Sequence, residues 1–240
     1  WIILALALTI VVGMSGVLDI GFAGTFAVGA YVAANLTGPA IGWRVALFPV
    51  PPDAIFVVGV SALVAGAVGV LRGLLTSRMR ADYLAIATLA LGLVIQDVIK
   101  YTSGVGGISA IPPPRFMGTP ISSQLTQYMI LGVIVMLVVV LTIRLQNSRS
   151  GRALAAIRED EYAAASSGVN VGAYKTTAFF ISSALAGLAG AMYASVVSYV
   201  DPDLAGFHIS VMTLAMATIG GAGSASGAVL GALAILGIDR

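Results

Sequence analysis

The chain has 240 residues, of which 59% are hydrophobic and 9% are charged, and its net charge is +2 at neutral pH. Since soluble domains carry roughly 25% charged residues, this composition excludes a soluble globular protein. Apolar segments of spanning length recur along the chain, and residues 131–143 are continuously apolar rather than alternating as in a membrane barrel. The sequence therefore predicts an all-α, polytopic transmembrane helical bundle, with residues 1–240 forming a single transmembrane domain whose two ends are both truncated.

The first two apolar segments, about residues 1–17 and 22–36, are separated by the glycine-rich stretch Gly13–Gly24. A loop with four prolines follows at residues 37–53, where proline cannot continue a helix. The third apolar segment covers about residues 54–71. Three arginines come close together after it, Arg72, Arg78 and Arg80. Because loops rich in Lys and Arg stay in the cytoplasm, we expect this loop to be cytoplasmic.

The fourth apolar segment runs from Tyr83 to about Ile99, and a glycine- and proline-rich loop follows that we expect on the outer side of the membrane. The fifth segment, about residues 126–143, leads back to a polar stretch at residues 147–168, which we call the island. Four arginines of this region, Arg144, Arg149, Arg152 and Arg158, place the island in the cytoplasm by the same rule.

The island predicts one or two short helices lying in water. Ser148 or Ser150 can cap the helix N-terminus, and Gly168 can close the last turn in the left-handed region. A polar helical segment between apolar runs suits the docking of a soluble partner. A solvated loop that only orients the protein by its arginines is the alternative from composition alone.

The sixth apolar segment spans about residues 174–197, and the last runs from 208 to 238 with a glycine-rich interruption at 219–227. We expect a broken helix or two half-spans there, giving about seven to eight spans or half-spans in total. Irregular backbone at membrane depth needs protein or water around it, so this stretch should face the interior. Two glycine-broken segments are typical of transporters with internal repeats, although coincidental packing glycines would look the same.

Five stretches of the chain carry a family resemblance. They are G-V-L-D-I-G-F-A-G-T-F-A-V-G-A-Y at 16–31, D-Y-L-A-I-A-T-L-A-L-G at 82–92, G-G-I-S-A-I-P at 106–112, S-R-S-G-R-A-L-A-A-I-R-E-D-E at 148–161 and I-G-G-A-G-S-A-S-G-A-V-L-G-A at 219–232. In this order they resemble the LivM-type permease subunit of branched-chain (hydrophobic) amino acid ABC transporters. Leu93 follows Gly92 where that family usually carries a glutamate.

The resemblance implies a permease subunit that forms half of the translocation pathway for branched-chain or hydrophobic amino acids. Its implied partners are a second, LivH-like permease subunit, two ATP-binding subunits, an extracytoplasmic substrate-binding protein and the lipid bilayer of a prokaryotic inner or plasma membrane. The only lysines, Lys100 and Lys175, are not part of a phosphate-binding loop, so the ATPase should lie in the partners and this chain should not be an enzyme.

The end of the island is similar to the E-A-A-x-x-x-G loop by which permeases of ABC importers dock on their ATPases, with the glutamate displaced by one position. The residues that this implies for ATPase coupling are Arg152, Arg158, Glu159, Asp160, Glu161, Ala163, Ala164 and Gly168. Small alanines let a helix enter a cleft, and the charged residues can fix its register.

Candidates for the substrate pathway are polar or glycine residues near the two broken segments and the outer loop. They are Asp19, Gly21, Thr88, Asp97, Thr102, Gly106, Gly107, Gly220, Gly221 and Gly223. Asp19 could face an aqueous path, accept hydrogen bonds from the broken backbone, or sit at the interface in the turn between two spans, and we favour this last, structural role. Asp97 could simply be reaching the headgroups.

The absence of cysteine and the presence of a single histidine exclude thiol chemistry and a histidine metal cluster, so no catalytic residue, metal or cofactor is expected. We expect His208 to be interfacial, and we expect no nucleic-acid partner. Rival functions are a related ABC importer for urea or short amides, an ion-coupled secondary transporter and a membrane scaffold. The secondary transporter would need intramembrane ionisable residues, for which only Asp19 and Asp97 qualify.

Overall fold

The computed structural model describes residues 1–240 except 39–51, 77–78, 80, 117–118, 122 and 239–240. In this described part, four helices are long and apolar enough to cross a bilayer. They are α4 (Ala54–Thr76), α5 (Ala81–Ser103), α6 (Gln124–Gln146) and α9 (Val171–Val197). The predicted helical membrane architecture is confirmed at this level. The proline-rich loop at 37–53 lies largely outside the described residues, as do Arg78 and Arg80.

Shorter apolar helices complete the bundle. α1 (Ile2–Leu8) continues as a π-helix, η1 (Thr9–Met14), and α2 (Phe22–Thr37) follows after a non-helical segment. Near the C-terminus, α10 (Phe207–Ile219) and α11 (Ala225–Ile238) are joined by the turn at residues 220–224. We call residues 15–21 the first break and residues 220–224 the second break. The interruption predicted within 219–227 is therefore present, and α11 begins two residues earlier than the end of that range.

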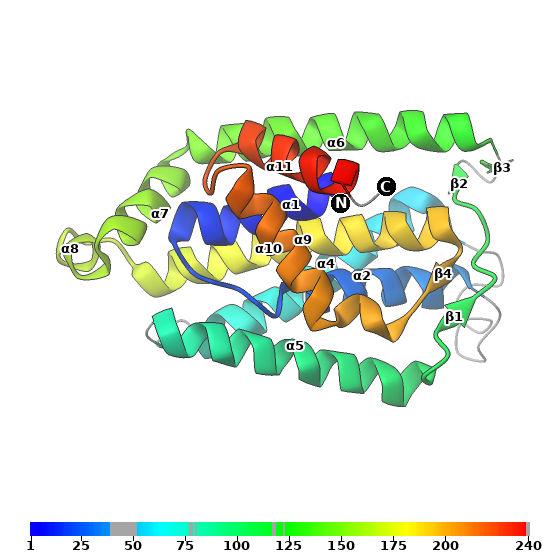
Figure 1. Ribbon diagram of the computed structural model, residues 1–240, viewed down its shortest axis with the longest axis horizontal. Coiled ribbons are helices and arrows are strands. Elements are labelled where there is room, and N and C mark those ends of the chain that lie inside the picture. The colour runs from blue at the N-terminus through cyan, green and yellow to red at the C-terminus, as the bar shows by residue number, and fades with distance from the viewer. Residues whose placement is uncertain (39–51, 77–78, 80, 117–118, 122, 239–240) are drawn as a thin grey trace.

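The centre of the molecule is formed by α2, α4 and α9, with α1 beside them (Figure 1). Their helices approach closely because glycines lie at the contacts. A Cβ atom at Gly29 would overlap the backbone of Gly187, and one at Gly190 would overlap the carbonyl oxygen of Phe26. Where lipid removes the hydrophobic drive between helices, such close van der Waals packing is what holds them together. Nearly every residue of α1 and η1 is buried.

The two ends of the bundle differ in character (Figure 1). The island helices α7 (Arg149–Glu159) and α8 (Glu161–Ser166) stand at one end, together with the C-terminus of α4 and the N-terminus of α5. We call this the α7 end. Four two-residue strands and the 3₁₀ helix η2 (Pro202–Ala205) lie at the opposite end, which we call the strand end.

The strands belong to segments that the sequence indicated only as loops. β1 (Ile108–Ser109) pairs antiparallel with β4 (Tyr199–Val200), and β2 (Arg115–Phe116) pairs with β3 (Thr119–Pro120). The first pair joins the loop after α5 to the turn after α9, two segments far apart in sequence. The glycine- and proline-rich loop is thus tied to the rest of the bundle at the strand end.

Two predicted boundaries are wrong. Arg72 was expected in a loop, but α4 continues to Thr76 and buries Arg72, whose side chain is only 2% exposed. Thr102 was expected in the outer loop, but α5 continues to Ser103. In α4 the apolar residues Leu74 and Leu75 continue the helix beyond Arg72. In α5 the Thr102 hydroxyl bonds back to the Val98 carbonyl oxygen within the last turn.

Candidate functional site

The island forms two short helices at the α7 end, as its capping residues predict. The side chain of Ser148, one of the two predicted caps, accepts a hydrogen bond of 3.1 Å from the Gly151 amide and so satisfies a free amide of the first turn. A Cβ atom at Gly151 would overlap the Leu145 carbonyl oxygen, so α7 can turn sharply away from α6 only with glycine there. Leu154 and Ile157 bury the inner face of α7.

α8 is fixed at both of its ends. The Asp160 carboxylate accepts hydrogen bonds from the amides of Tyr162 (2.8 Å) and Ala163 (3.0 Å). At the other end Gly168 has φ +85°, its amide donates to Ala165, and the Val169 amide donates to Ala164. This pair of bonds is the Schellman arrangement that needs a left-handed residue at this place. The predicted left-handed role of Gly168 is confirmed.

The eight residues predicted for ATPase coupling divide into two groups in the structure. Seven of the eight residues are exposed, all except Ala164. The first group is Arg152, Glu159, Asp160, Ala163 and Gly168, of which Arg152 and Asp160 bond to groups of the island itself. The other three are engaged with the rest of the chain. Ala164 is buried, the Glu161 carboxylate accepts a 2.7 Å hydrogen bond from the ammonium of Lys175 on α9, and the Arg158 guanidinium donates to the Gly13 carbonyl oxygen at 2.7 Å.

Sequence reasoning missed two residues of the island region. Tyr162 is 82% exposed on α8, between the three acidic residues and the alanines. The sequence did carry a signal for it, because Tyr162 is the only aromatic or large apolar residue between positions 159 and 168. Lys175 is 5% exposed and holds Glu161. Its role depends on the approach of α9 to α8, which no local pattern encodes.

The first break and the first turn of α2 are held by side chains from α5 and α10. The Ile20 amide donates to the Thr88 hydroxyl of α5 at 3.2 Å, and the Ala23 amide donates to the Ser210 hydroxyl of α10 at 3.1 Å. The first turn of α2 thereby finds acceptors that its own sequence does not supply, since no side chain at Gly21 can cap it. The backbone of Gly21 lies against Thr88, where a Cβ atom would overlap the Thr88 carbonyl oxygen.

Asp19, within the first break, faces Arg72 of α4. The two side chains form a hydrogen-bonded ion pair, and their exposures are 1% and 2%. One carboxylate oxygen, Oδ2, and two guanidinium nitrogens, Nε and Nη1, have no hydrogen-bond partner in the described part of the chain. Of the three environments considered for Asp19, the structure shows neither an open aqueous path nor an exposed interfacial turn, because the carboxylate is buried against a base.

The second break lies directly against Gly13, near the end of η1 and two positions before the first break. A Cβ atom at Gly13 would overlap the amide nitrogen of Gly223, and one at Gly223 would lie 3.0 Å from the Gly13 carbonyl oxygen. The Gly223 carbonyl oxygen accepts a 3.0 Å hydrogen bond from the side-chain amide of Gln146, the last residue of α6. Gly220 packs against Gly227 across the turn and Gly221 is exposed. The two glycine-broken segments that the sequence singled out thus meet at one point.

The other pathway candidates do not join this cluster. Asp97 is exposed on α5, and Thr102 is exposed in its last turn, where its hydroxyl donates to the Val98 carbonyl oxygen. The Gly106 carbonyl oxygen accepts a long hydrogen bond from the Tyr199 hydroxyl, and Gly107 packs on Val200. These four residues belong to the strand half of α5 and its following loop. The candidates therefore form an inner group at the two breaks and an outer group at the strand end.

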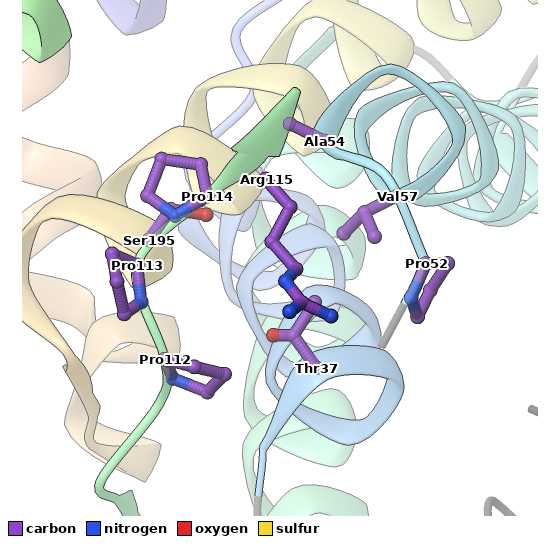
Figure 2. A pocket seen from close by; sticks show the side chains of 9 residues that line it. All are labelled: Thr37, Pro52, Ala54, Val57, Pro112, Pro113, Pro114, Arg115 and Ser195. Carbon is purple, nitrogen blue, oxygen red and sulfur yellow. The ribbon is translucent and has the colours of Figure 1, made fainter. Parts of the chain in front are cut away.

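A small hollow lies at the strand end, between the ends of α2, α4 and α9 (Figure 2). Thr37, Val57, Pro112 and Ser195 are among the residues that line it, and the Arg115 side chain extends into it. It has room for about one water molecule. A space of this size cannot hold an amino acid, so it is not the substrate site in the conformation seen here.

These features define a class of protein. The described part holds four helices of spanning length packed with shorter apolar helices, a glycine break that lies against the end of η1, and a capped polar helix pair at one end. The chain is a polytopic helical membrane protein. Along its full length, residues 1–240, it matches the family described as branched-chain amino acid transport system / permease component, and it belongs to that family.

Among curated relatives, the chain is 34% identical to the high-affinity branched-chain amino acid transport system permease protein LivM of Escherichia coli (strain K12). The LivM protein of Salmonella typhimurium is equally similar, and both matches cover 98% of this chain and 60% of the relative. The LivH protein of Escherichia coli (strain K12) is 28% identical over 64% of this chain and 51% of the relative. The chain thus spans less than two thirds of the LivM proteins. No solved structure matches the chain.

Proposed function

We propose that this chain is a transmembrane subunit of an ABC importer, forms half of the translocation pathway, and carries branched-chain or other hydrophobic amino acids inward across a bacterial inner membrane. The observation that carries the proposal is the island. It is a preformed, capped helix pair with an apolar inner face and a polar outer face, at one end of a spanning bundle. Membership of the branched-chain permease family supports the substrate class.

The island is proposed as the docking element for an ATP-binding partner. Its outer face offers charges of both signs, Arg152 beside Glu159 and Asp160, which can fix the register of a partner. Tyr162 and the exposed Ala163 supply apolar contact area at the tip. Exposed aromatic residues are frequent anchors of protein interfaces. Ala164 is buried, and Glu161 and Arg158, although exposed, are bonded to Lys175 and Gly13. We therefore assign these three residues supporting roles in the proposed contact.

A second permease subunit, two ATP-binding subunits and an extracytoplasmic binding protein complete the proposed assembly. The similarity of this chain to both LivM and LivH supports a pairing of two related subunits around the pathway. In this arrangement the inner group of candidates, Asp19, Gly21, Thr88 and the glycines of the second break, lies on the cytoplasmic side of the pathway. The outer group, Asp97, Thr102, Gly106 and Gly107, lies on the side where the binding protein delivers its ligand.

The decisive experiment is reconstitution of this chain with its partner subunits in liposomes, with labelled leucine and labelled urea as alternative substrates. We expect ATP-dependent uptake of leucine that urea does not compete with. Uptake of urea instead would assign the chain to an importer of small amides. Leucine uptake that follows an ion gradient and needs no ATP-binding subunit would overturn the ABC assignment.

Docking is tested in the same system with Ala163→Trp, which places a bulky side chain on the exposed face of α8. We expect assembly with the ATP-binding subunits and ligand-stimulated ATP hydrolysis to fall at least about tenfold, the loss typical of an interface anchor position. Met136→Trp, at a side chain 72% exposed on α6, is the matched control and should leave both unchanged. Normal stimulation in Ala163→Trp would show that α8 is not in the contact.

A further inference from the structure

A contact between the island and the two breaks is not explained by docking itself. Arg158 lies in the last turn of α7 and is exposed, but its side chain reaches back to the end of η1 and to both breaks. The guanidinium donates from Nη1 to the Gly13 carbonyl oxygen at 2.7 Å, and the side-chain stem packs on Gly16, where a Cβ atom would lie 2.9 Å from Arg158 Cγ. The same Nη1 would lie 3.2 Å from a Cβ atom at Gly223. One side chain thus touches both breaks.

Gln146 makes the complementary contact from the end of α6. Its side-chain amide donates to the Gly223 carbonyl oxygen at 3.0 Å. Gly223 lies in the turn between α10 and α11, whereas the Gly13 carbonyl group that Arg158 holds lies in the last turn of η1, where helix carbonyls lack intrahelical partners and carry partial negative charge. A guanidinium is the natural partner for such a place. We call Gly13, Gly223, Arg158 and Gln146 the clasp.

The geometry makes the clasp tight as well as polar. Gly13 and Gly223 touch through their backbones, so neither can gain a side chain without moving the other. Gly223 has φ +99°, which only glycine adopts without strain. On the island side, Leu154 and Ile157 bury α7 against the bundle, so the helix cannot move outward without pulling on Arg158. The island and both breaks are therefore linked through packed groups and short hydrogen bonds.

We propose that Arg158 is the positioning residue that transmits movement of the docked island to the two glycine breaks, with Gln146 as its support. The inference rests on the proposed function, because it needs a partner that moves α7. When the ATP-binding subunits displace α7, Arg158 carries Gly13 and Gly223 with it, and the inner end of the pathway opens or closes. Coupling then depends on Arg158, whereas docking and hydrolysis depend on the outer face of the island.

The test uses the complete reconstituted transporter with its binding protein and leucine. Arg158→Gln shortens the side chain and removes the charge, and Arg158→Lys keeps a charged donor of nearly full reach. Arg144→Gln is the matched control, since Arg144 is an exposed arginine at the end of α6 outside the clasp. For each variant we measure leucine transported per ATP hydrolysed, together with the amount of assembled complex.

In Arg158→Gln we expect normal assembly and hydrolysis with about tenfold less leucine transported per ATP. Arg158→Lys should recover to within about threefold of the wild type, and Arg144→Gln should match it. A wild-type ratio in Arg158→Gln would overturn the proposal, as would parallel loss of hydrolysis and transport, which indicates failed docking. If the wild-type complex does not couple ATP hydrolysis to leucine uptake, the proposed function is wrong, and the clasp proposal is wrong with it. The wild-type measurement alone shows this outcome, so it is distinct from a failure of the clasp proposal by itself.

A distance measurement follows the clasp directly. The chain has no cysteine, so nitroxide labels at Arg149→Cys on α7 and Ser226→Cys beside the second break are the two labels of this subunit, which is labelled before assembly with its partners. With Arg158 intact, the label distance should be the same in the nucleotide-free and vanadate-trapped complexes, because the two elements move together. In Arg158→Gln the distance should shift between these states. A shift of equal size with Arg158 intact would contradict the proposal.

Discussion

The buried charges of this protein do not act alike, and their surroundings explain the difference. Asp19 and Arg72 are both enclosed, yet three of their polar atoms lack a hydrogen-bond partner in the described part of the chain. An ion pair of this kind gains little over apolar residues of the same size, but losing one partner leaves a bare charge inside the protein. It therefore specifies how the first break sits on α4 more than it adds to stability.

Asp19→Asn tests this reading against a matched carboxylate. Because the substitution leaves the Arg72 guanidinium buried without its counter-charge, we expect a loss of about 3–5 kcal/mol in the free energy of unfolding. Asp97→Asn, at an exposed position of α5, should change it by less than about 0.5 kcal/mol. Unfolding in detergent followed by circular dichroism gives both values. Equal losses of unfolding free energy in the two variants would show that leaving Arg72 without its counter-charge does not destabilise the protein.

The pair between Glu161 and Lys175 predicts an asymmetry. Lys175 is 5% exposed and Glu161 is 48% exposed. Removing the carboxylate with Glu161→Gln leaves a buried ammonium poorly paired, and we expect a cost of about 1–3 kcal/mol. Lys175→Met leaves the carboxylate able to bind water and fills the site with an apolar chain, so its cost should stay below about 1 kcal/mol. Thermal unfolding of the two variants, measured in parallel, compares the two losses of stability. A larger loss in Lys175→Met than in Glu161→Gln would refute the asymmetry.

At the scale of helices, glycine placement decides which elements pack. α2, α4 and α9 approach so closely that Cβ atoms at their contact glycines would overlap neighbouring backbone. By contrast α6 contacts the bundle through few buried side chains, Val138 and Thr142 among them, and most of its length is exposed. A Cβ atom added at Gly132 of α6 would meet no other atom of the described chain within 4 Å. The same residue type is thus structural in the central helices and incidental in α6.

Gly187→Ala and Gly132→Ala form a matched pair for this distinction. A Cβ atom at Gly187 would overlap Ala65 and lie 2.7 Å from the Ser61 carbonyl oxygen, so we expect a loss of about 1–3 kcal/mol. At Gly132 the alanine meets open space and improves helix propensity, so stability should stay equal or rise by up to about 1 kcal/mol. Melting temperatures in detergent would report the difference, and an unharmed Gly187→Ala would mean that α4 and α9 are not in close contact.

For the whole molecule, the two ends of the bundle should lie on opposite sides of the membrane. The cysteine-free sequence allows Tyr162→Cys, on α8, to be compared with Val105→Cys, after α5, at native side chains 82% and 79% exposed. In intact spheroplasts, a membrane-impermeant maleimide should label Val105→Cys at once and Tyr162→Cys only after lysis, since arginine-rich loops remain inside. Labelling of Tyr162→Cys in intact cells would invert the topology.

Local signals in the sequence predicted local structure well. The Ser148 cap, the left-handed Gly168 and the interruption after Ile219 each follow from residue types within a few positions of one another. What the sequence could not predict are the contacts between distant segments. Arg158 reaches Gly13 across 145 positions, and Arg72 reaches Asp19 across 53, because helix packing and not spacing brings them together. The misplacement of Arg72 in a loop has the same origin, since a buried arginine needs a partner that only the fold supplies.

The distance between Asp19 and Arg72 along the chain also sets an order of events during synthesis. Ribosomes add about 5–20 residues per second, so the 53 residues between the two take about 3–10 s to appear. During that interval the first break, with its carboxylate, has left the ribosome without the guanidinium that neutralises it in the folded protein. α1 and α2 therefore cannot settle into their final place when they are made. They must wait beside water or the insertion machinery until α4 arrives.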